Sequence, residues 1–457
     1  MNSKHEPSAT AGELDPGFGE NGTTSLDTPD PNYPFYNSNI VAVSTDNKTY
    51  VAGTAYKDPN LSINTLARLN TDGSIDKTFA DNGFFHGQFG NSDQTYLLNE
   101  EINFLENKIL LIGRLFNFDS GELFIDKAAI CFNENGSINK EFGTQGIFLF
   151  RAPEDNPDEH SRTACAQVFL EKSQSLRTPS YESSTAKSHK SSTSLIAEDR
   201  IFLIHTAGSF EHTNSYIVCI DHNGVLDPTF NGSGFNCAQH PIYPHLKLFS
   251  LTIDNHLDYL CGGEVRVDYH GEPDAIVLAK YKKDGTLDKN YQKDGFLLIA
   301  DLQSDKTLYL SKLVKQPNNR TLGIGITVDK NSLAASGLLF SLENDGTRNI
   351  QFNSGKDMSI QLGSVDTDFI DAKFLPDGRF FTSAIRNNFT ADSRYAVARF
   401  LFNGTLDTRY ADGAGYYAYS QVKSSRYEST TLTDNDTIVL NLDGAVTPSA
   451  IGRGLLS

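Results

Sequence analysis

The sequence predicts an all-β fold, a seven-bladed β-propeller in which each blade holds four antiparallel strands. Two features of the 457-residue chain predict it: one motif recurs seven times, and short apolar stretches alternate with turn residues between the copies. In addition, no apolar pattern with a 3.6-residue period is long enough for a helix. A β-solenoid is the alternative, but its coils are usually shorter than these units of about 60 residues.

The recurring motif reads Asx-Gly-x-Leu-Asx-x-x-Phe, with another glycine four residues after the ring. Two clear copies are "DHNGVLDPTF", from Asp221 to Phe230, and "KKDGTLDKNY", from Lys282 to Tyr291. Five of the six gaps between motif glycines are 58 to 63 residues long, and the sixth, of 88 residues, contains an insertion. The motif glycines are Gly12, Gly73, Gly136, Gly224, Gly285, Gly346 and Gly404.

Four strands are predicted in each unit. After the motif comes a short apolar run such as "GIFLF", then a hairpin such as "VAVSTDNKTYVAG", in which two alternating strands flank a turn at residues 46–48. An apolar strand such as "TLARLN" closes the unit before the next motif. This order is typical of a propeller blade.

The motif itself is predicted to be an architectural element. Asx-Gly supplies a turn that accepts positive φ. Leu226 and Phe230 lie four residues apart, which predicts one turn of α- or 3₁₀-helix that inserts both side chains between neighbouring blades. Asp227 would cap this turn by accepting backbone N–H groups. Because Asp or Asn recurs at this position in every copy, a structural role is favoured over a ring of catalytic acids or of cation ligands.

The predicted domain plan is an N-terminal tail over residues 1–11 and one propeller over residues 12–457. Residues 12–22 hold a motif but precede the first strand, so we expect them to close the ring by filling the wedge between the last and first blades. A Ser/Thr-rich insertion at about residues 152–195 is predicted to be an exposed loop. The alternative for this insertion is a segment that binds a partner, is cleaved by a protease or is modified.

Composition and sequence argue against nucleic acid and membranes as partners. The net charge of −18 argues against nucleic acid and against anionic membranes. No stretch approaches the roughly 18 apolar residues of a membrane span, and the N-terminal sequence has no apolar signal region. The five cysteines lack a CxxC pair, which favours free thiols. We expect a monomer that is cytoplasmic or released without a classical signal peptide.

Catalytic motifs are missing from the sequence: there is no phosphate-binding loop, no HExxH and no GxSxG. The weak metal candidates are Cys237, His240 and His245 in "CAQHPIYPHL", the centre of a histidine-rich region from His205 to His270. The spacing offers no second ligand pair, so unrelated surface or core side chains are favoured. No cofactor and no catalytic residue is predicted.

The motif copies "GELDPGFGENG" and "GSINKEFGTQG" resemble the bacterial delta-60 repeat, a β-propeller repeat of unknown function. The resemblance extends from Gly12 to about Ser457, with departures at Arg348 and after Tyr410. It implies a propeller and supplies no catalytic residues.

The predicted function is therefore a binding or interaction module for an unknown protein or carbohydrate. One alternative is an enzyme with a site at the channel face, such as a metal-assisted hydrolase or lyase. Another is a released bacterial factor that binds a host glycan or protein. Carbohydrate-binding propellers often use tryptophan, which is absent here, although the tyrosines of "GAGYYAY" could substitute.

Overall fold

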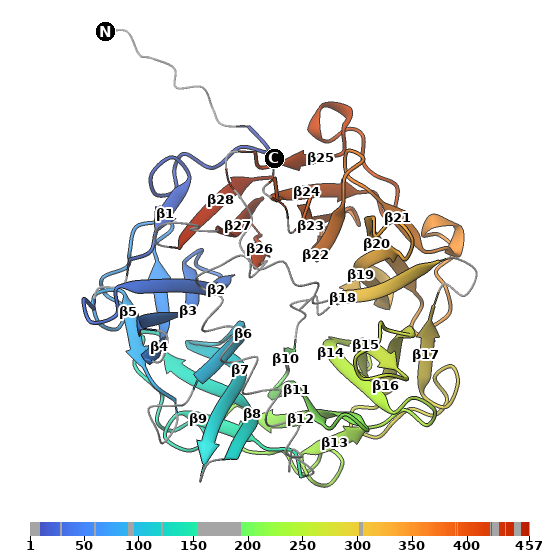
Figure 1. The fold of residues 1–457 in the computed structure, drawn as a ribbon, viewed down its shortest axis with the longest axis horizontal. Helices are drawn as coiled ribbons and strands as arrows, with labels where there is room; N and C mark the ends of the chain where they lie inside the picture. Colours follow the sequence, from blue (N-terminus) through green and yellow to red (C-terminus); the bar gives the residue numbers. More distant parts are fainter. Residues whose placement is uncertain are drawn as a thin grey trace.

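A computed structural model shows a β-propeller, with sheets arranged around a central axis (Figure 1). The structure describes residues 10–27, 30–58, 61–89, 96–119, 122–153, 193–300, 305–388, 390, 392–420, 422, 429–434, 436–442 and 449–456. The all-β prediction is confirmed for these residues, whose only helices are three single-turn 3₁₀ segments. These segments are η2 (Pro317–Asn319), η3 (Asn353–Gly355) and η4 (Ala411–Gly413).

Five sheets have four antiparallel strands each. The first two comprise β2 (Phe35–Val43), β3 (Thr49–Asp58), β4 (Leu61–Leu69) and β5 (Phe84–Gly87), then β6 (Tyr96–Leu105), β7 (Lys108–Asp119), β8 (Glu122–Asn133) and β9 (Ile147–Phe150). Two more comprise β18 (Lys306–Gln316), β19 (Arg320–Asp329), β20 (Ala335–Leu342) and β21 (Met358–Ile360), then β22 (Thr367–Phe374), β23 (Phe380–Arg386), β24 (Arg394–Phe400) and β25 (Tyr416–Ala418). The fifth joins β26 (Thr430–Leu432), β27 (Thr437–Leu442) and β28 (Ala450–Leu455) to β1 (Thr23–Ser25).

The other eight strands form a single sheet, so the prediction of seven separate four-stranded sheets is corrected to five such sheets and one of eight strands. This sheet contains β10 (Ser194–Ala197), β11 (Arg200–Gly208), β12 (Thr213–Asp221), β13 (Phe235–Ala238), β14 (His245–Ile253), β15 (Tyr259–Arg266), β16 (Ala275–Tyr281) and β17 (Phe296–Ile299). Its two halves meet at one parallel pair, Thr213 with His245. The link forms because the Thr213 N–H donates to the Pro244 carbonyl at 3.0 Å, which draws β14 alongside β12.

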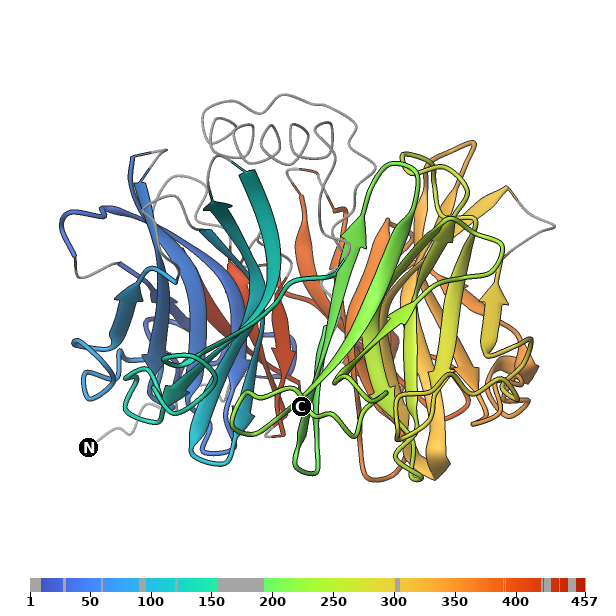
Figure 2. The ribbon, with the colours of Figure 1, turned by 90° about the horizontal axis from the view of Figure 1, so that it is seen from below.

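The core lies between adjacent sheets. Figure 1 shows β2, β6, β14, β18 and β22 near the axis, and Figure 2 shows the sheets standing side by side. Leu66 of the first sheet packs in one cluster with Leu111 and Ile130 of the second. Along β2, burial on both faces matches a strand covered by a sheet on each side.

The motif forms a single hydrogen-bonded turn that has the i→i+3 bond of the predicted 3₁₀ turn but does not continue as a regular helix. The Phe230 N–H donates to the Asp227 carbonyl at 3.0 Å, and Leu226 pairs with Ile220 as an isolated bridge. The Thr229 N–H donates to Asp227 Oδ1 at 2.9 Å, so Asp227 does cap the turn. A helical continuation is prevented because this bridge keeps the start of the motif extended against the preceding strand.

The motif rings of the first six units each support the glycine of the next motif. Phe230 is fully buried, and a Cβ added to Gly285 would lie 2.9 Å from its ring atoms. Beside this contact, the Asn231 N–H donates to the Asp284 carbonyl at 2.7 Å. We call this pair of contacts the ring–glycine latch. Its ring contact recurs at Gly73, Gly136, Gly224, Gly346 and Gly404, which meet Phe18, Phe79, Phe142, Tyr291 and Phe352, respectively.

The first motif bridges the two ends of the chain. β1 pairs with β28, and Arg453 forms an ion pair with Asp15 at 2.7 Å. Phe18 is buried in a cluster that contains Val51 of β3 and Val439 of β27. Residues from both ends of the chain therefore complete the last sheet and its packing against the first.

Deleting residues 12–22 should lower the melting temperature sharply, because Phe18 and the Asp15–Arg453 pair are lost together. The single change Phe18→Ala should cost about 3–5 kcal/mol of unfolding free energy. Phe35→Ala is the control, since Phe35 is 64% exposed and should change stability by less than about 0.5 kcal/mol. An unchanged melting curve for the deletion would contradict this role.

Gly285→Ala tests the ring–glycine latch in chemical denaturation. Gly285 (φ +84°) and Gly232 (φ +74°) both need left-handed backbone, but a Cβ at Gly232 meets no atom within 4 Å. Gly232→Ala should therefore lower the unfolding free energy by about 1 kcal/mol, the cost of placing a side chain on left-handed backbone. Gly285→Ala should cost about 1–3 kcal/mol more, because its methyl group overlaps the Phe230 ring. Equal losses in the two variants would show that the ring contact is unimportant.

Candidate functional site

The three weak metal candidates have separate surroundings. Cys237 is exposed on β13, while the Nδ1 atom of His240 accepts the Ile242 N–H at 3.2 Å in the following loop. His245 is buried on β14 with its Nδ1 atom 3.0 Å from Thr213 Oγ1. In the part of the chain that the structure describes, no group of three His, Cys, Asp or Glu side chains is placed to hold a metal ion.

The other sequence features have mainly structural surroundings where they are described. Burial raises the pKa of the Cys131 thiol to about 11 and that of Cys219 to about 12, so neither is a ready nucleophile. In "GAGYYAY", residues 416–418 form β25 and Tyr419 is fully buried. Cys165 and residues 154–192 of the predicted insertion lie outside the described residues.

The motif carboxylates are engaged in structural contacts. Asp76 forms an ion pair with Arg68 at 2.8 Å, and the guanidinium lies 4.7 Å above the Phe79 ring. Burial opposes ionisation of Asp76, but hydrogen bonds from Thr78 and the charges of Lys48 and Arg68 outweigh it and lower the pKa to about 2. Arg68 also donates to the Glu134 carbonyl at 2.6 Å. These carboxylates anchor the turns and are not poised as catalytic acids.

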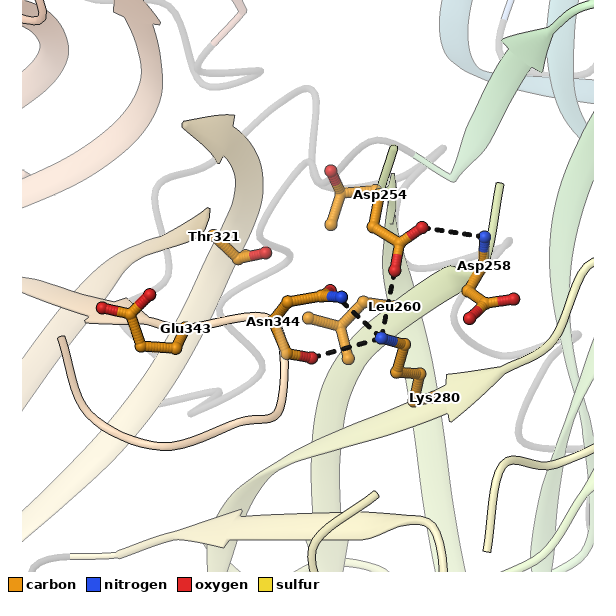
Figure 3. Close-up of a pocket in the computed structure, with 8 residues that line it drawn as sticks. Asp254, Asp258, Leu260, Lys280, Thr321, Glu343 and Asn344 are labelled. Carbon is orange, nitrogen blue, oxygen red and sulfur yellow. Dashed lines mark hydrogen bonds and ion pairs between the residues drawn. The ribbon is translucent and has the colours of Figure 1, made fainter. Parts of the chain in front are cut away.

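Figure 3 shows a small hollow between the eight-stranded sheet and the sheet of β18–β21. Its volume of about 10 Å³ is close to the minimum that one water molecule needs. Lys280 spans it, with its Nζ atom 3.0 Å from Asp254 Oδ2 and 3.0 Å from Asn344 Oδ1. Lys280 thus fills most of this hollow between the two sheets. The volume that remains is too small for an organic ligand.

A larger gathering of charged side chains lies along the first strands. β-Bulges interrupt β6, β18 and β22, and the residues directly after the register shifts are Glu101, Lys312 and Asp371. A bulge re-aims the side chain beside it. Three first strands near the axis therefore carry a charged residue at equivalent positions (Figure 1). We call Glu100, Glu101, Lys127, Lys312 and Asp371 the inner-strand cluster.

Glu100 is shared by two cations. Its Oε2 atom lies 2.5 Å from Lys127 Nζ, and its Oε1 atom lies 2.7 Å from Arg114 Nε. Lys127 is 1% exposed and also donates to Thr193 Oγ1 at 3.0 Å. Burial opposes ionisation of Glu100, but the two cations outweigh it and lower its pKa to about 2.

Glu101 has a different environment from its neighbour. Its Oε2 atom accepts the Ser194 hydroxyl at 2.6 Å and the Ser194 N–H at 3.1 Å. Burial raises the pKa of Glu101 above its usual value, although Ser194 and the charges of Lys312 and Lys127 oppose this rise. Adjacent carboxyl groups therefore have pKa values moved in opposite directions.

Lys312 and Asp371 form the other half of the cluster. Lys312 Nζ lies 2.7 Å from Asp371 Oδ1. Burial opposes the charge of Lys312, but Asp371 outweighs it and raises the pKa of Lys312. Together these groups can donate and accept hydrogen bonds and can neutralise either sign of charge on a polar ligand.

Sequence reasoning missed this cluster, although it left a signal. Paired acids in "LNEEINF" and a lysine before the apolar run of "KAAICF" break the expected alternation of buried strands. Only an alignment of the hairpins by their bulges, which the structure supplies, places Glu101, Lys312 and Asp371 at equivalent positions. The bulges themselves have no sequence signature here, because the inserted residues are of different types.

The family model described as "Domain of unknown function (DUF5122) beta-propeller" matches residues 45–79. This partial match supports a β-propeller repeat family, and the delta-60 assignment stays a prediction. No curated protein sequence is significantly similar to the chain.

Several solved structures resemble the chain at low identity. YCF48 from Cyanidioschyzon merolae is 9% identical over 94% of this chain and 98% of its own, with a TM-score of 0.42. A protein of unknown function from Dyadobacter fermentans is 10% identical over 95% and 100%, with a TM-score of 0.42. The α-L-arabinanase of Penicillium chrysogenum complexed with arabinobiose is 8% identical over 95% and 98%, also with a TM-score of 0.42.

Within the described ranges, the structure has no helix of the length and apolarity that a membrane crossing requires.

Glu100→Gln should reduce the unfolding free energy at pH 7 by about 3–5 kcal/mol, because it leaves Lys127 buried without its carboxylate. The double variant Glu100→Gln, Lys127→Met should recover part of this loss. Denaturant unfolding measures both effects. A loss that is no smaller in the double variant would show that the unpaired Lys127 charge is not its cause.

Glu100→Gln should also change how the unfolding free energy depends on pH at acid pH. The pKa of Glu100 is about 2 in the folded chain, below the value of 4.5 expected when unfolded. Its contribution is therefore complete above about pH 4.5 and is lost as the pH falls towards 2. Between these values the unfolding free energy of Glu100→Gln should depend less steeply on pH than that of the wild type. Parallel pH profiles would contradict the assignment.

Proposed function

We propose that this chain is a binding module, a seven-bladed β-propeller that takes a polar ligand at the inner-strand cluster. The two halves of the eight-stranded sheet would act as separate blades, because among the described residues Thr213–His245 is the one pair in the strand register between them. Each half has four strands, like the other sheets.

One observation supports the site above all others. Three first strands place Glu101, Lys312 and Asp371 directly after equivalent bulges. Burying charged groups costs free energy, and an apolar core of the same shape is often at least as stable. Perturbed pKa values gather at functional sites more often than elsewhere. A ligand-binding role accounts for charges in a position where stability does not require them.

The second candidate is an enzyme that acts at the same cluster. The neighbouring Glu100 and Glu101 favour it, because acid–base chemistry uses two carboxyl groups whose pKa values are moved apart. In that case Glu101, with its raised pKa, would be the proton donor and Glu100 would stay ionised. The exposure of Glu100 is only 15%, so a substrate would have to reach a confined carboxylate.

A glycan array and a thermal-shift panel of polar metabolites would test the binding module. At least one compound should raise the melting temperature, and Lys312→Met should weaken its binding at least tenfold in calorimetry. Lys315→Met is the matched control, since Lys315 is exposed on the same strand, and it should bind normally.

Equal binding by Lys312→Met, or no binding by any compound, would overturn the proposal. Conversion of a bound compound to product would favour the enzyme, provided that Glu101→Gln abolishes the conversion and keeps the binding.

A further inference from the structure

Lys247 on β14 has an unusual environment for an ammonium group. The side chain is half-buried, and Nζ lies 5.0 Å from the centre of the Tyr269 ring. In the described part of the chain, no carboxylate forms an ion pair with Lys247. An ammonium group removed from water normally acquires a counter-charge.

The acid opposite Lys247 is paired with an arginine. Glu264 lies opposite Lys247 in the β14–β15 register, but its Oε1 atom accepts Arg266 Nη2 at 2.6 Å and Arg266 Nε at 3.0 Å. Arg266 in turn donates from Nη1 to the Gly271 carbonyl at 2.5 Å, which fixes the guanidinium in place. Lys247, Arg266 and Glu264 together carry one excess positive charge, and Lys247 is the cation without an ion pair to a described residue.

Further positive charge surrounds Lys247. Burial lowers the pKa of Lys247, and the charges of Arg266 and Arg114 lower it further, with only Glu264 opposing them. Arg114 is the residue that also pairs with Glu100 of the inner-strand cluster. The positive group therefore adjoins the proposed binding site, in a chain whose net charge is −18.

Aromatic side chains lie beside Lys247 and Tyr269. Tyr269 contacts Phe210 at 4.8 Å between ring centres and His245 at 5.4 Å. His270 lies 5.4 Å from Phe210 and is exposed. A charged group of a ligand at Lys247 would have ring surfaces beside it for the rest of the molecule.

We propose that Lys247 anchors an oxyanion, the carboxylate, phosphate or sulfate group of the ligand. This inference rests on the proposed binding function and adds the charge of the ligand. A neutral ligand would leave Lys247 without a counter-charge, whereas an oxyanion supplies the negative charge that Lys247 lacks.

Calorimetric titrations with sodium glucuronate, sodium phosphate and glucose, at constant ionic strength, test the proposal. Glucuronate or phosphate should bind the wild-type chain, and glucose should not. Lys247→Met should weaken oxyanion binding at least tenfold, whereas Lys315→Met, which removes the same charge from an exposed site, should not.

A measurement on the wild-type chain alone covers the case in which Lys247→Met fails to fold. Phosphate or glucuronate should slow acetylation of Lys247 by acetic anhydride, followed by mass spectrometry of its peptide. Acetylation of Lys315 should be unaffected by either anion.

Absence of oxyanion binding, or equal protection of both lysines, would overturn the role of Lys247. If a neutral compound from the panel still binds and depends on Lys312, the binding module stands and only the oxyanion inference fails. If oxyanions bind with full strength to Lys247→Met, a different cation holds them and the inference is also wrong.

Discussion

The contact between a motif ring and the next motif glycine joins successive repeat units, and much of the fold depends on it. Phe230 fills the space under Gly285, while the Asn231 N–H bonds to the Asp284 carbonyl. Any side chain larger than hydrogen at Gly285 would overlap the ring. Asn231 has φ +52°, which turns the chain so that its N–H can reach the next unit. Backbone geometry and core packing are therefore decided at the same few residues.

In two units, an aspartate of the motif pairs with an arginine of the strand before it. Where the strand carries Arg68 or Arg399, the motif supplies Asp76 or Asp407, and both pairs are within 3 Å. Where the strand carries Ser341, the motif supplies Asn349, which donates to the serine hydroxyl at 3.0 Å. A buried carboxylate is used where a cation lies opposite, and a neutral amide is used in this serine unit. The pairing supports a structural role for the motif acids.

The inner-strand cluster differs from the motif in how its residues are distributed among the units. Its charges do not recur in every unit: the position of Glu101, Lys312 and Asp371 is occupied by Ile40 in β2 and by Ser250 in β14. A residue needed to build a blade should appear in most blades, as the motif rings do. Charges that appear at only some of these positions are not needed to build a blade, which is the basis for the proposed ligand site.

The sequence alone determined the repeat, the all-β class and the role of the motif as a turn, because these depend on local spacing and on backbone preferences. Asp227 could be assigned as a cap from its neighbours Pro228 and Phe230 alone. The tertiary structure decided the rest. Whether Thr213 and His245 pair, and which strands carry bulges, depends on contacts between residues far apart in the chain. Glu101, Lys312 and Asp371 are separated by some sixty residues or more, so only the closed ring of sheets relates them.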